Sequence, residues 1–317
     1  MHDKNQSIAL KYGLVAVLLW STVATAFKLA LNTMSPTQLL FIASVTTSIV
    51  LFIIILKQNK LGLVGRTLAN TSSYAVLIPS ALLNPVLYYI TLFSAYDLLP
   101  AQQAQSINYT WAITLSLLAA IFLKQKLTKI DMLALLLAYV GTLIISTKGD
   151  VFSLQFESLL GVSLALISTF LWGIYWIINV KNTADAIVTL FLSFLISLPI
   201  LFIMLVMGGE LNSLTTEGIW YAIYIGLFEM GITFVLWLKA LKYAENTTQI
   251  SSLIFISPFI SLIFIYLILQ EPIYSATLLG LVFIVTGLVL QQKCQNKTPS
   301  QASYNSDIPD HNIKQPN

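Results

Sequence analysis

The chain has 317 residues, of which 57% are hydrophobic and only 9% are charged, and its mean hydropathy is +0.83. A soluble domain carries about 25% charged residues and could not cover this much apolar surface with polar side chains, so the composition excludes a water-soluble fold and predicts an all-α integral membrane protein. The net charge of +3 and the single cysteine, Cys294, argue against a nucleic-acid-binding protein and exclude a disulfide within the chain.

Ten apolar runs follow one another along the chain, and each is long enough to cross the hydrocarbon core of a bilayer as a helix. They are expected at about 8–31, 35–56, 74–96, 101–123, 130–147, 159–180, 186–207, 218–241, 248–269 and 274–292. The first run lacks a small-residue cleavage site, so it is expected to be a retained span rather than a removed signal peptide. Residues 1–7 are expected to form a cytoplasmic N-terminal stub. Residues 294–317 are too polar to bury apolar area and are expected to form a disordered cytoplasmic tail.

The basic residues predict the orientation of these spans. When the loops are assigned alternately to two sides, 14 of the 16 Lys and Arg residues fall on one side, and only Lys28 and Lys148 fall on the other. Cytoplasmic loops carry the excess of basic residues. We therefore predict that both termini are cytoplasmic and that the linker 148–158 is external. A wrong number of spans would scramble this asymmetry, so it also supports ten.

The two halves of the chain share a weak internal repeat at an offset of about 145 to 152 residues. Leu18-Leu19-Trp20 matches Phe170-Leu171-Trp172, and Leu123 and Gly141 match Leu269 and Gly287. Five spans per half is an odd number, so the second half, 159–293, must enter the bilayer upside down relative to the first, 8–147. Inverted repeats of this kind place a substrate site near the midplane where the halves meet.

Four short motifs carry a resemblance to a known family. They are Leu18-Leu19-Trp20-Ser21 followed by Lys28, then Ala95-Tyr96-Asp97-Leu98-Leu99-Pro100-Ala101-Gln102, then Ile107-Asn108-Tyr109-Thr110-Trp111, and finally the stretch from Gln270-Glu271-Pro272 to Gly287. Over about 8–292 the chain resembles the EamA-type permeases of the drug/metabolite transporter superfamily. The resemblance implies a ten-helix carrier of two inverted five-helix halves, in a family of which many members are thought to export amino acids or related metabolites.

Two positions depart from the pattern of that family. Gln125 stands where an acidic residue usually opens the loop after the fourth helix, although the matching Glu271 is present. Ala112 stands where a proline often follows the tryptophan of the fourth helix, so this helix is expected to be straighter than usual.

Several kinds of chemistry are not expected inside the membrane. Both histidines, His2 and His311, lie in the polar ends of the chain, and no aspartate is central to a span, so neither histidine-dependent catalysis nor a paired-aspartate protease is expected. The sequence also lacks a metal-binding cluster and a P-loop. We therefore expect no enzyme activity, no metal and no cofactor.

Glu229 is the outstanding polar residue, since it lies near the middle of the eighth span. A carboxylate at the bilayer centre costs about 3 kcal/mol, so it should face the protein interior. It is either a proton-coupling or amine-binding group, or a hydrogen-bonded structural residue that stays neutral. Its repeat partner at an offset of 145 is Asn84, and Pro85 beside it frees a backbone carbonyl, either as a tolerated bend or as a kink used in gating.

Other candidate substrate-binding residues form polar and aromatic stripes. Gln105, Asn108 and Tyr109 share a face of the fourth span, and they either line the substrate path or form hydrogen bonds between helices. Trp172 and Trp176 in the sixth span and Tyr88 in the third either contact substrate or pack. Lys28 either binds a substrate carboxylate or Glu229, or extends to the outer interface.

Together these patterns predict a multi-pass transporter of the bacterial inner membrane that exports small amphipathic metabolites, such as amino acids. Transport would be facilitated or proton-coupled, with Glu229 as the coupling residue, and would proceed by alternating access. The alternative is a membrane scaffold or assembly factor that transports nothing. The expected partners are a small-molecule substrate and the lipid bilayer, without nucleic acid.

Overall fold

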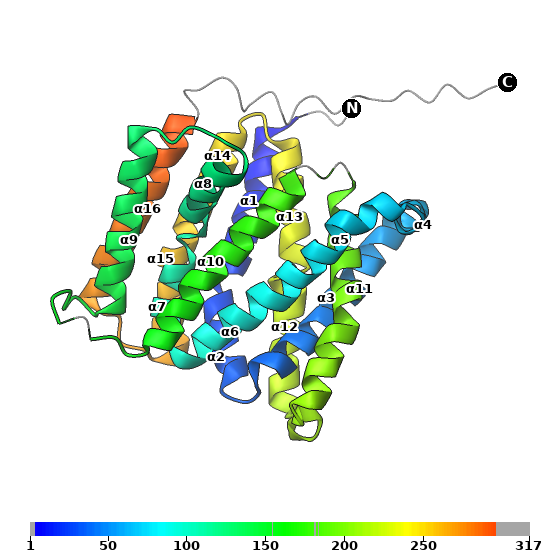
Figure 1. Cartoon of the computed structure of the whole chain (residues 1–317), viewed down its shortest axis with the longest axis horizontal. Coiled ribbons are helices and arrows are strands. Elements are labelled where there is room, and N and C mark those ends of the chain that lie inside the picture. The colour runs from blue at the N-terminus through cyan, green and yellow to red at the C-terminus, as the bar shows by residue number, and fades with distance from the viewer. Residues whose placement is uncertain (1–3, 154, 181, 183, 296–317) are drawn as a thin grey trace.

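The computed structural model describes residues 4–295 except 154, 181 and 183, and all regular elements in this part of the chain are helices (Figure 1). The prediction of an all-α membrane protein is therefore confirmed. Residues 296–317 of the expected tail and the first three residues of the N-terminal stub lie outside the described residues, while Cys294 and Gln295 belong to the last helix.

Each half of the chain contributes a set of long helices and short irregular turns. The first half contains α1 (Gln6–Ser21), α2 (Val23–Leu31), α3 (Pro36–Lys57), α4 (Leu61–Ala69), the 3-10 turn η1 (Thr71–Ser73), α5 (Tyr74–Ala81), the π-helical segment η2 (Leu82–Leu87), α6 (Tyr88–Leu98), α7 (Ala101–Asn108), α8 (Trp111–Phe122) and α9 (Lys129–Ser146). The second contains α10 (Leu159–Val180), α11 (Ala186–Met207), the 3-10 turn η3 (Glu210–Ser213), α12 (Thr216–Phe228), α13 (Ile232–Tyr243), α14 (Thr247–Ser252), the 3-10 turn η4 (Leu253–Ile256), α15 (Ser257–Phe264), the π-helical segment η5 (Ile265–Leu269) and α16 (Ser275–Gln295).

Side chains at the helix starts explain several of the predicted boundaries. The Ser35 side chain accepts a hydrogen bond from the Gln38 backbone N–H at 3.2 Å, and Pro36 follows at the first helical position of α3. The Asp185 carboxylate accepts from the backbone N–H groups of Ile187 and Val188 at 3.0 and 3.2 Å and so begins α11. The expected spans 35–56 and 186–207 therefore start within one residue of the observed helices.

Nine helical stretches in the described part of the chain are long and apolar enough to cross a membrane. The expected fourth span, 101–123, is not among them: α7, its first part, carries the amides Gln102, Gln103, Gln105 and Asn108, and the span is divided into α7 and α8, as other spans are divided too. The Thr110 hydroxyl donates to the Ile107 carbonyl at 2.8 Å, and the backbone there forms a tight turn in which the Thr110 N–H bonds the same carbonyl at 3.1 Å. The expectation of a straighter fourth helix is therefore wrong, because a threonine turn interrupts it without a proline.

Four interruptions fall at matching positions of the two halves. Asn84 has extended backbone angles, φ −137° and ψ 111°, between α5 and α6, and Glu229 to Gly231 separate α12 from α13. In the same way the turn between α7 and α8 matches the η4 turn between α14 and α15 at the repeat offset. Broken helices at equivalent places in inverted halves are the arrangement that builds a site near the midplane.

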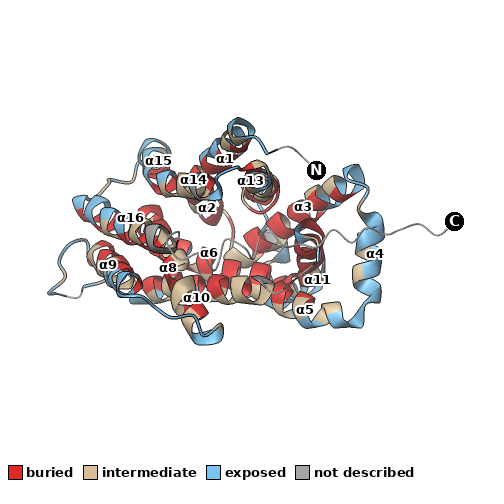
Figure 2. Cartoon of the chain, turned by 90° about the horizontal axis from the view of Figure 1, so that it is seen from above, coloured by how far each residue is buried: buried red, intermediate tan, exposed pale blue. Residues whose placement is uncertain are grey.

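The helices pack into one bundle whose buried residues lie towards its centre (Figure 2). At one edge α9 lies against α16, where a Cβ added to Gly141 would lie 2.5 Å from the Gly280 carbonyl oxygen. Only glycine permits this close backbone approach between the two helices. At the other edge α4 lies beside α11 and α5 and runs across the bundle, and none of its residues is buried (Figures 1 and 2).

Candidate functional site

A cavity of about 1050 Å³ lies between the two halves of the bundle. Its wall comes from α1, α2, α6, α7 and α8 of the first half and from α10, α13, α14, η4, α16 and the break after α12 of the second. Twelve of its lining residues are aromatic: Trp20, Phe27, Tyr88, Tyr89, Tyr96, Tyr109, Trp111, Trp172, Trp176, Phe234, Trp237 and Phe255. The cavity is large enough for a small metabolite and is predominantly apolar, as ligand sites usually are.

Glu229 reaches this cavity because α12 ends at it. The Glu229 and Met230 N–H groups both bond the Ile225 carbonyl, at 2.8 and 3.3 Å, and close the helix. Gly231 then takes the non-helical angles φ −108° and ψ −92°, and a Cβ there would lie 2.8 Å from the Gly226 carbonyl oxygen. The break thus depends on a glycine and leaves the carboxylate on the cavity wall.

The first half of the chain holds Glu229 in place across the cavity. The Tyr89 hydroxyl donates to Glu229 Oε1 at 3.2 Å, and the Trp20 indole N–H donates to the Glu229 backbone carbonyl at 3.5 Å. Among the described residues Tyr89 is the only side chain that hydrogen-bonds the carboxylate. One carboxylate oxygen therefore remains without a protein partner.

Trp172 is the centre of an aromatic cluster that joins the two halves. Its ring lies 4.7 Å from Tyr88, 6.0 Å from Trp176, 6.3 Å from Trp111 and 6.4 Å from Phe234, measured between centroids. These distances are typical of stacked and edge-to-face aromatic pairs. The cluster therefore forms a continuous aromatic surface from α6 and α8 through α10 to α13.

Polar groups on this wall are few. The Asn108 amide donates to the Ser168 hydroxyl of α10 at 3.0 Å, so it links α7 to the second half. Gln105, one turn before, is 5% exposed. The buried Trp176 indole N–H has no hydrogen-bond partner among the described residues. These groups can orient a ligand that the aromatic rings enclose.

Seven of the nine predicted substrate-binding residues line the cavity, namely Tyr88, Gln105, Asn108, Tyr109, Trp172, Trp176 and Glu229. Asn84 is buried at the break before α6 and is not part of the wall, and its side-chain carbonyl lacks a hydrogen-bond partner among the described residues. Lys28 is also outside the wall.

Lys28 instead closes the end of a helix. Its ammonium donates to the backbone carbonyls of Tyr96 and Asp97 in the last turn of α6, at 2.8 and 3.4 Å, and to that of Leu99, which directly follows the helix, at 3.0 Å. A lysine in this position satisfies orphan carbonyls and complements the helix dipole. In the described part of the chain its hydrogen-bond partners are these carbonyls, 68 to 71 residues further on, and not the Glu229 carboxylate.

The second half of the chain also contacts the turn between α6 and α7. The Glu271 carboxylate accepts from the Ala101 backbone N–H at 3.0 Å, at the start of α7, and the Gln102 amide donates to the Pro272 carbonyl at 2.8 Å. At this end the cavity wall consists of Phe27 and Tyr96, which are both buried. At the opposite end, where the chain begins, the wall includes the exposed Gln125. The cavity is therefore closed at the Lys28 end and open at the Gln125 end.

Replacing Lys28 with Met is expected to loosen the closed end, because each charged hydrogen bond lost there is worth about 1.5 to 3 kcal/mol. The measurement is the labelling rate of a Tyr96→Cys reporter by a bulky thiol reagent, in protein whose Cys294 is replaced by Ser. We expect this rate to rise about tenfold. Lys239→Met is the matched control, because Lys239 contacts the Tyr12 ring at the other end of the bundle. Equal labelling of both variants would contradict a role for Lys28 in closure.

Several wall residues escaped the sequence analysis, including Trp20, Tyr89, Trp111, Phe234 and Trp237. Phe234, Trp237, Leu238 and Leu241 recur at helical spacing along α13, which is the signal that could have identified them. On an apolar helix such a stripe predicts a packed face but does not distinguish a cavity from lipid. In the described part of the chain no three His, Cys, Asp or Glu residues are grouped as metal ligands.

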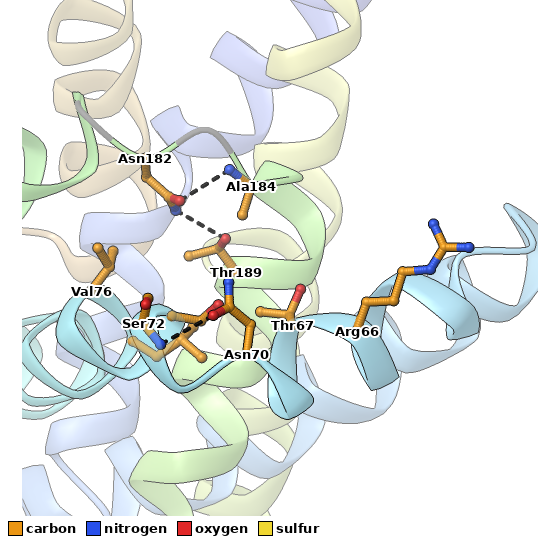
Figure 3. Close-up of a pocket in the computed structure, with 10 residues that line it drawn as sticks. Arg66, Thr67, Asn70, Ser72, Val76, Asn182, Ala184 and Thr189 are labelled. Atoms are coloured by element: carbon orange, nitrogen blue, oxygen red, sulfur yellow. Dashed lines mark hydrogen bonds between the residues drawn. The ribbon is translucent and has the colours of Figure 1, made fainter. Parts of the chain in front are cut away.

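A second, smaller pocket of about 390 Å³ lies between η1, α5 and the start of α11 (Figure 3). Its amides are used within the protein: Asn182 accepts from the Ala184 N–H at 3.0 Å and donates to the Thr189 hydroxyl at 3.1 Å, and Asn70 accepts from the Ser72 N–H at 3.1 Å. The Arg66 side chain points away from these residues in Figure 3. These contacts stabilise local turns, so the large cavity is the better candidate for a functional site.

Known proteins with similar sequences are transporters. The chain is 25% identical over 273 residues to an "Uncharacterized transporter" of Clostridium kluyveri, which covers 83% of this chain and 86% of that protein. It is 23% identical over 292 residues to an "Uncharacterized transporter" of Methanothermobacter thermautotrophicus, covering 87% and 84% of the two chains. It is also 24% identical over 224 residues to the "Uncharacterized transporter YvbV" of Bacillus subtilis, covering 69% and 72%.

A protein crystal structure shares the fold, with a TM-score of 0.65 over 93% of this chain and 100% of that one, at 18% identity. The model of the EamA-like transporter family matches residues 7–147 and 159–291, one segment in each half of the chain. Since these two segments make up most of the sequence, the chain is a membrane transporter that belongs to the EamA-like transporter family.

Proposed function

We propose that this transporter moves small amphipathic metabolites, such as amino acids, out of the cell across the bacterial inner membrane. The observation that carries the proposal is the aromatic cavity between the halves, with the Glu229 carboxylate on its wall at a helix break. A scaffold protein has no need of an apolar cavity of this size with a carboxylate on its wall. Transport, rather than catalysis, accounts for both features.

Alternating access is the proposed mechanism. In this structure the cavity is closed where Lys28 and Glu271 hold the turn between α6 and α7, and it is open at Gln125. Movement of one repeat, 8–147, against the other, 159–293, would close the open end and open the closed one. We propose that the linker 148–158 is external, and there Lys148 forms an ion pair with Glu157 at 3.0 Å. The hydrogen bond to Glu157 raises the pKa of Lys148, so this contact persists at physiological pH.

Glu229 is the proposed coupling residue. The other ionisable groups on the described cavity wall are tyrosines, so Glu229 is the only carboxyl group there and is the group we assign to proton exchange. Tyr89 bonds it directly, and Tyr88 stacks on Tyr89 at 4.7 Å. Exchange of a proton at Glu229, first on one side and then on the other, would couple substrate movement to the proton gradient.

The direct test is flux from proteoliposomes loaded with a mixture of the standard amino acids and their decarboxylated amines. The purified protein should speed the exit of at least one component relative to protein-free liposomes, as measured by mass spectrometry. An inward-directed proton gradient should increase that exit further. If no component leaves faster than from protein-free liposomes, the proposal is overturned and a scaffold becomes the better account.

The proposed topology has its own test. A Cys at position 152, where Phe152 is 96% exposed, should react with a membrane-impermeant reagent added to whole cells, whereas a Cys at position 61, where Leu61 is 49% exposed, should react only after permeabilisation. The reason is that 14 of 16 basic residues place residue 61 on the cytoplasmic side. Labelling at 61 but not at 152 would reverse the proposed orientation.

A further inference from the structure

The charge on the cavity wall is of one sign. Among the described residues that line it, Glu229 is the only one with a charged side chain, and there is no Lys, Arg or His. Lys28, which is on α2, has its ammonium on the backbone carbonyls of Tyr96, Asp97 and Leu99 at the end of α6 and does not belong to the wall. A ligand in this cavity therefore meets one carboxylate and many aromatic rings.

We propose that the cavity selects organic monocations, in which a protonated or quaternary amine is attached to an aromatic or aliphatic body and no carboxylate is present. This inference rests on the proposed transport function and narrows its substrate class. An ammonium group can pair with the free oxygen of Glu229, because Tyr89 occupies the other at 3.2 Å. The body of the ligand would then lie against the rings around Trp172.

Aromatic faces beside the carboxylate strengthen this preference. Trp20, which bonds the Glu229 backbone, lies 5.4 Å from Trp237 and 6.2 Å from Phe234. Cations are attracted to the faces of such rings, and the attraction is strongest for tryptophan and in sites removed from water. The ammonium would therefore be enclosed by ring faces on one side and by Glu229 on the other.

The same wall disfavours a ligand carboxylate. Neutral donors such as the Trp176 indole N–H are present, but a negative group taken out of water is stabilised best by a cation, and the described wall has none. Glu229 would in addition repel it. An amino acid should therefore bind more weakly than the amine that has the same side chain, and a simple carboxylic acid should bind most weakly of all.

The tryptophans of the protein provide a fluorescence signal for ligand binding. Five of its six tryptophans, Trp20, Trp111, Trp172, Trp176 and Trp237, line the cavity. The sixth, Trp220, is 67% exposed and outside it. Intrinsic tryptophan fluorescence therefore reports mainly on this cavity.

The experiment is a fluorescence titration of the purified full chain with four phenyl probes of equal length, at about pH 8, where a primary amine keeps its proton. The probes are 2-phenylethylamine, phenylalanine, 2-phenylethanol and 3-phenylpropionate, which are cationic, zwitterionic, uncharged and anionic, respectively. We expect 2-phenylethylamine to bind about tenfold more tightly than 2-phenylethanol, and 3-phenylpropionate to bind most weakly.

The carboxylate is tested with two matched variants. Glu229→Gln should remove the difference between 2-phenylethylamine and 2-phenylethanol. Glu217→Gln should leave it, because Glu217, in the first turn of α12, also accepts a hydrogen bond from a tyrosine hydroxyl, that of Tyr221 at 3.1 Å, but lies outside the cavity. Retention of 2-phenylethanol binding by Glu229→Gln shows that the variant is folded.

The outcomes separate this inference from the proposed function. If phenylalanine or 3-phenylpropionate binds as tightly as 2-phenylethylamine, the proposed selection of cations is wrong. Flux of an amino acid in the proteoliposome assay would still support the proposed transport function. An absence of quenching by all four probes overturns the inference whatever the flux. Preference for 2-phenylethylamine that Glu229→Gln abolishes supports it.

Discussion

Replacing Glu229 with Gln is expected to abolish accumulation of substrate against its gradient while leaving exchange down a gradient intact at saturating substrate, where weaker binding of a cation by the variant no longer limits the rate. The amide keeps the size of the side chain and can still accept the Tyr89 hydrogen bond at 3.2 Å, so packing around the break after α12 should persist. It removes the carboxyl group that is the proposed site of proton exchange on the cavity wall. A carrier without such a group has no means to couple its cycle to a proton gradient.

The measurement compares proteoliposomes with and without an imposed pH gradient, using the substrate found in the efflux screen. The gradient should raise transport by the parent protein and by Glu217→Gln, which is the control at the start of α12. It should have no effect on Glu229→Gln. If Glu229→Gln responds to the gradient as the parent does, Glu229 is structural, and facilitated diffusion becomes the better description.

The sequence predicts the two ends of a span well when the length of its apolar run sets them. The observed helices Pro36–Lys57 and Ala186–Met207 agree with the expected 35–56 and 186–207 to within one residue. Both begin at a side-chain cap that is local in sequence, so their starts need no tertiary information. Interruptions inside spans are harder to predict, because the turn at Thr110 depends on a hydroxyl bond that competes with the helix.

The internal repeat aligns Glu229 with Asn84 at an offset of 145 residues. Both residues lie at helix breaks, one after α12 and the other before α6, although nothing in the local composition of either span identifies a break except Gly231 and Pro85. The repeat locates them because inverted halves that share a fold share the depth of their irregularities. It does not reveal that only Glu229 reaches the cavity wall.

Lys28 shows what a single sequence leaves undetermined. A lysine near a helix end has the same pattern whether it extends to the interface, binds substrate or caps another helix. Its partners, the carbonyls at the end of α6 and of Leu99 just after it, lie 68 to 71 residues away in the chain and are free to accept because that helix ends at Leu98. The choice among the alternatives thus depends on packing between helices. The sequence also cannot show which face of α13 lines the cavity, because that depends on how α13 packs in the bundle.

Replacing Trp172 with Ala is expected to have the largest effect on binding of any single aromatic change. The Trp172 ring contacts Tyr88, Trp111 and Phe234, and so it joins the aromatic surfaces that the two halves contribute. Removal of a buried aromatic residue at the centre of a site typically costs at least 2 kcal/mol of binding, which corresponds to about a 30-fold loss of affinity. The measurement is the concentration of 2-phenylethylamine, or of the substrate found in the efflux screen, that half-saturates exchange in proteoliposomes.

Two further variants separate loss of the ring from loss of the fold. Trp172→Phe keeps an aromatic ring in the cluster and should recover most of the affinity, because a phenyl group still fills much of the space between Tyr88 and Phe234. Trp220→Ala removes an exposed tryptophan outside the cavity and should leave half-saturation unchanged. If Trp172→Ala half-saturates at the same concentration as the parent, the aromatic cluster only packs the two halves together. The substrate path must then run along the part of the wall nearer Gln105 and Asn108.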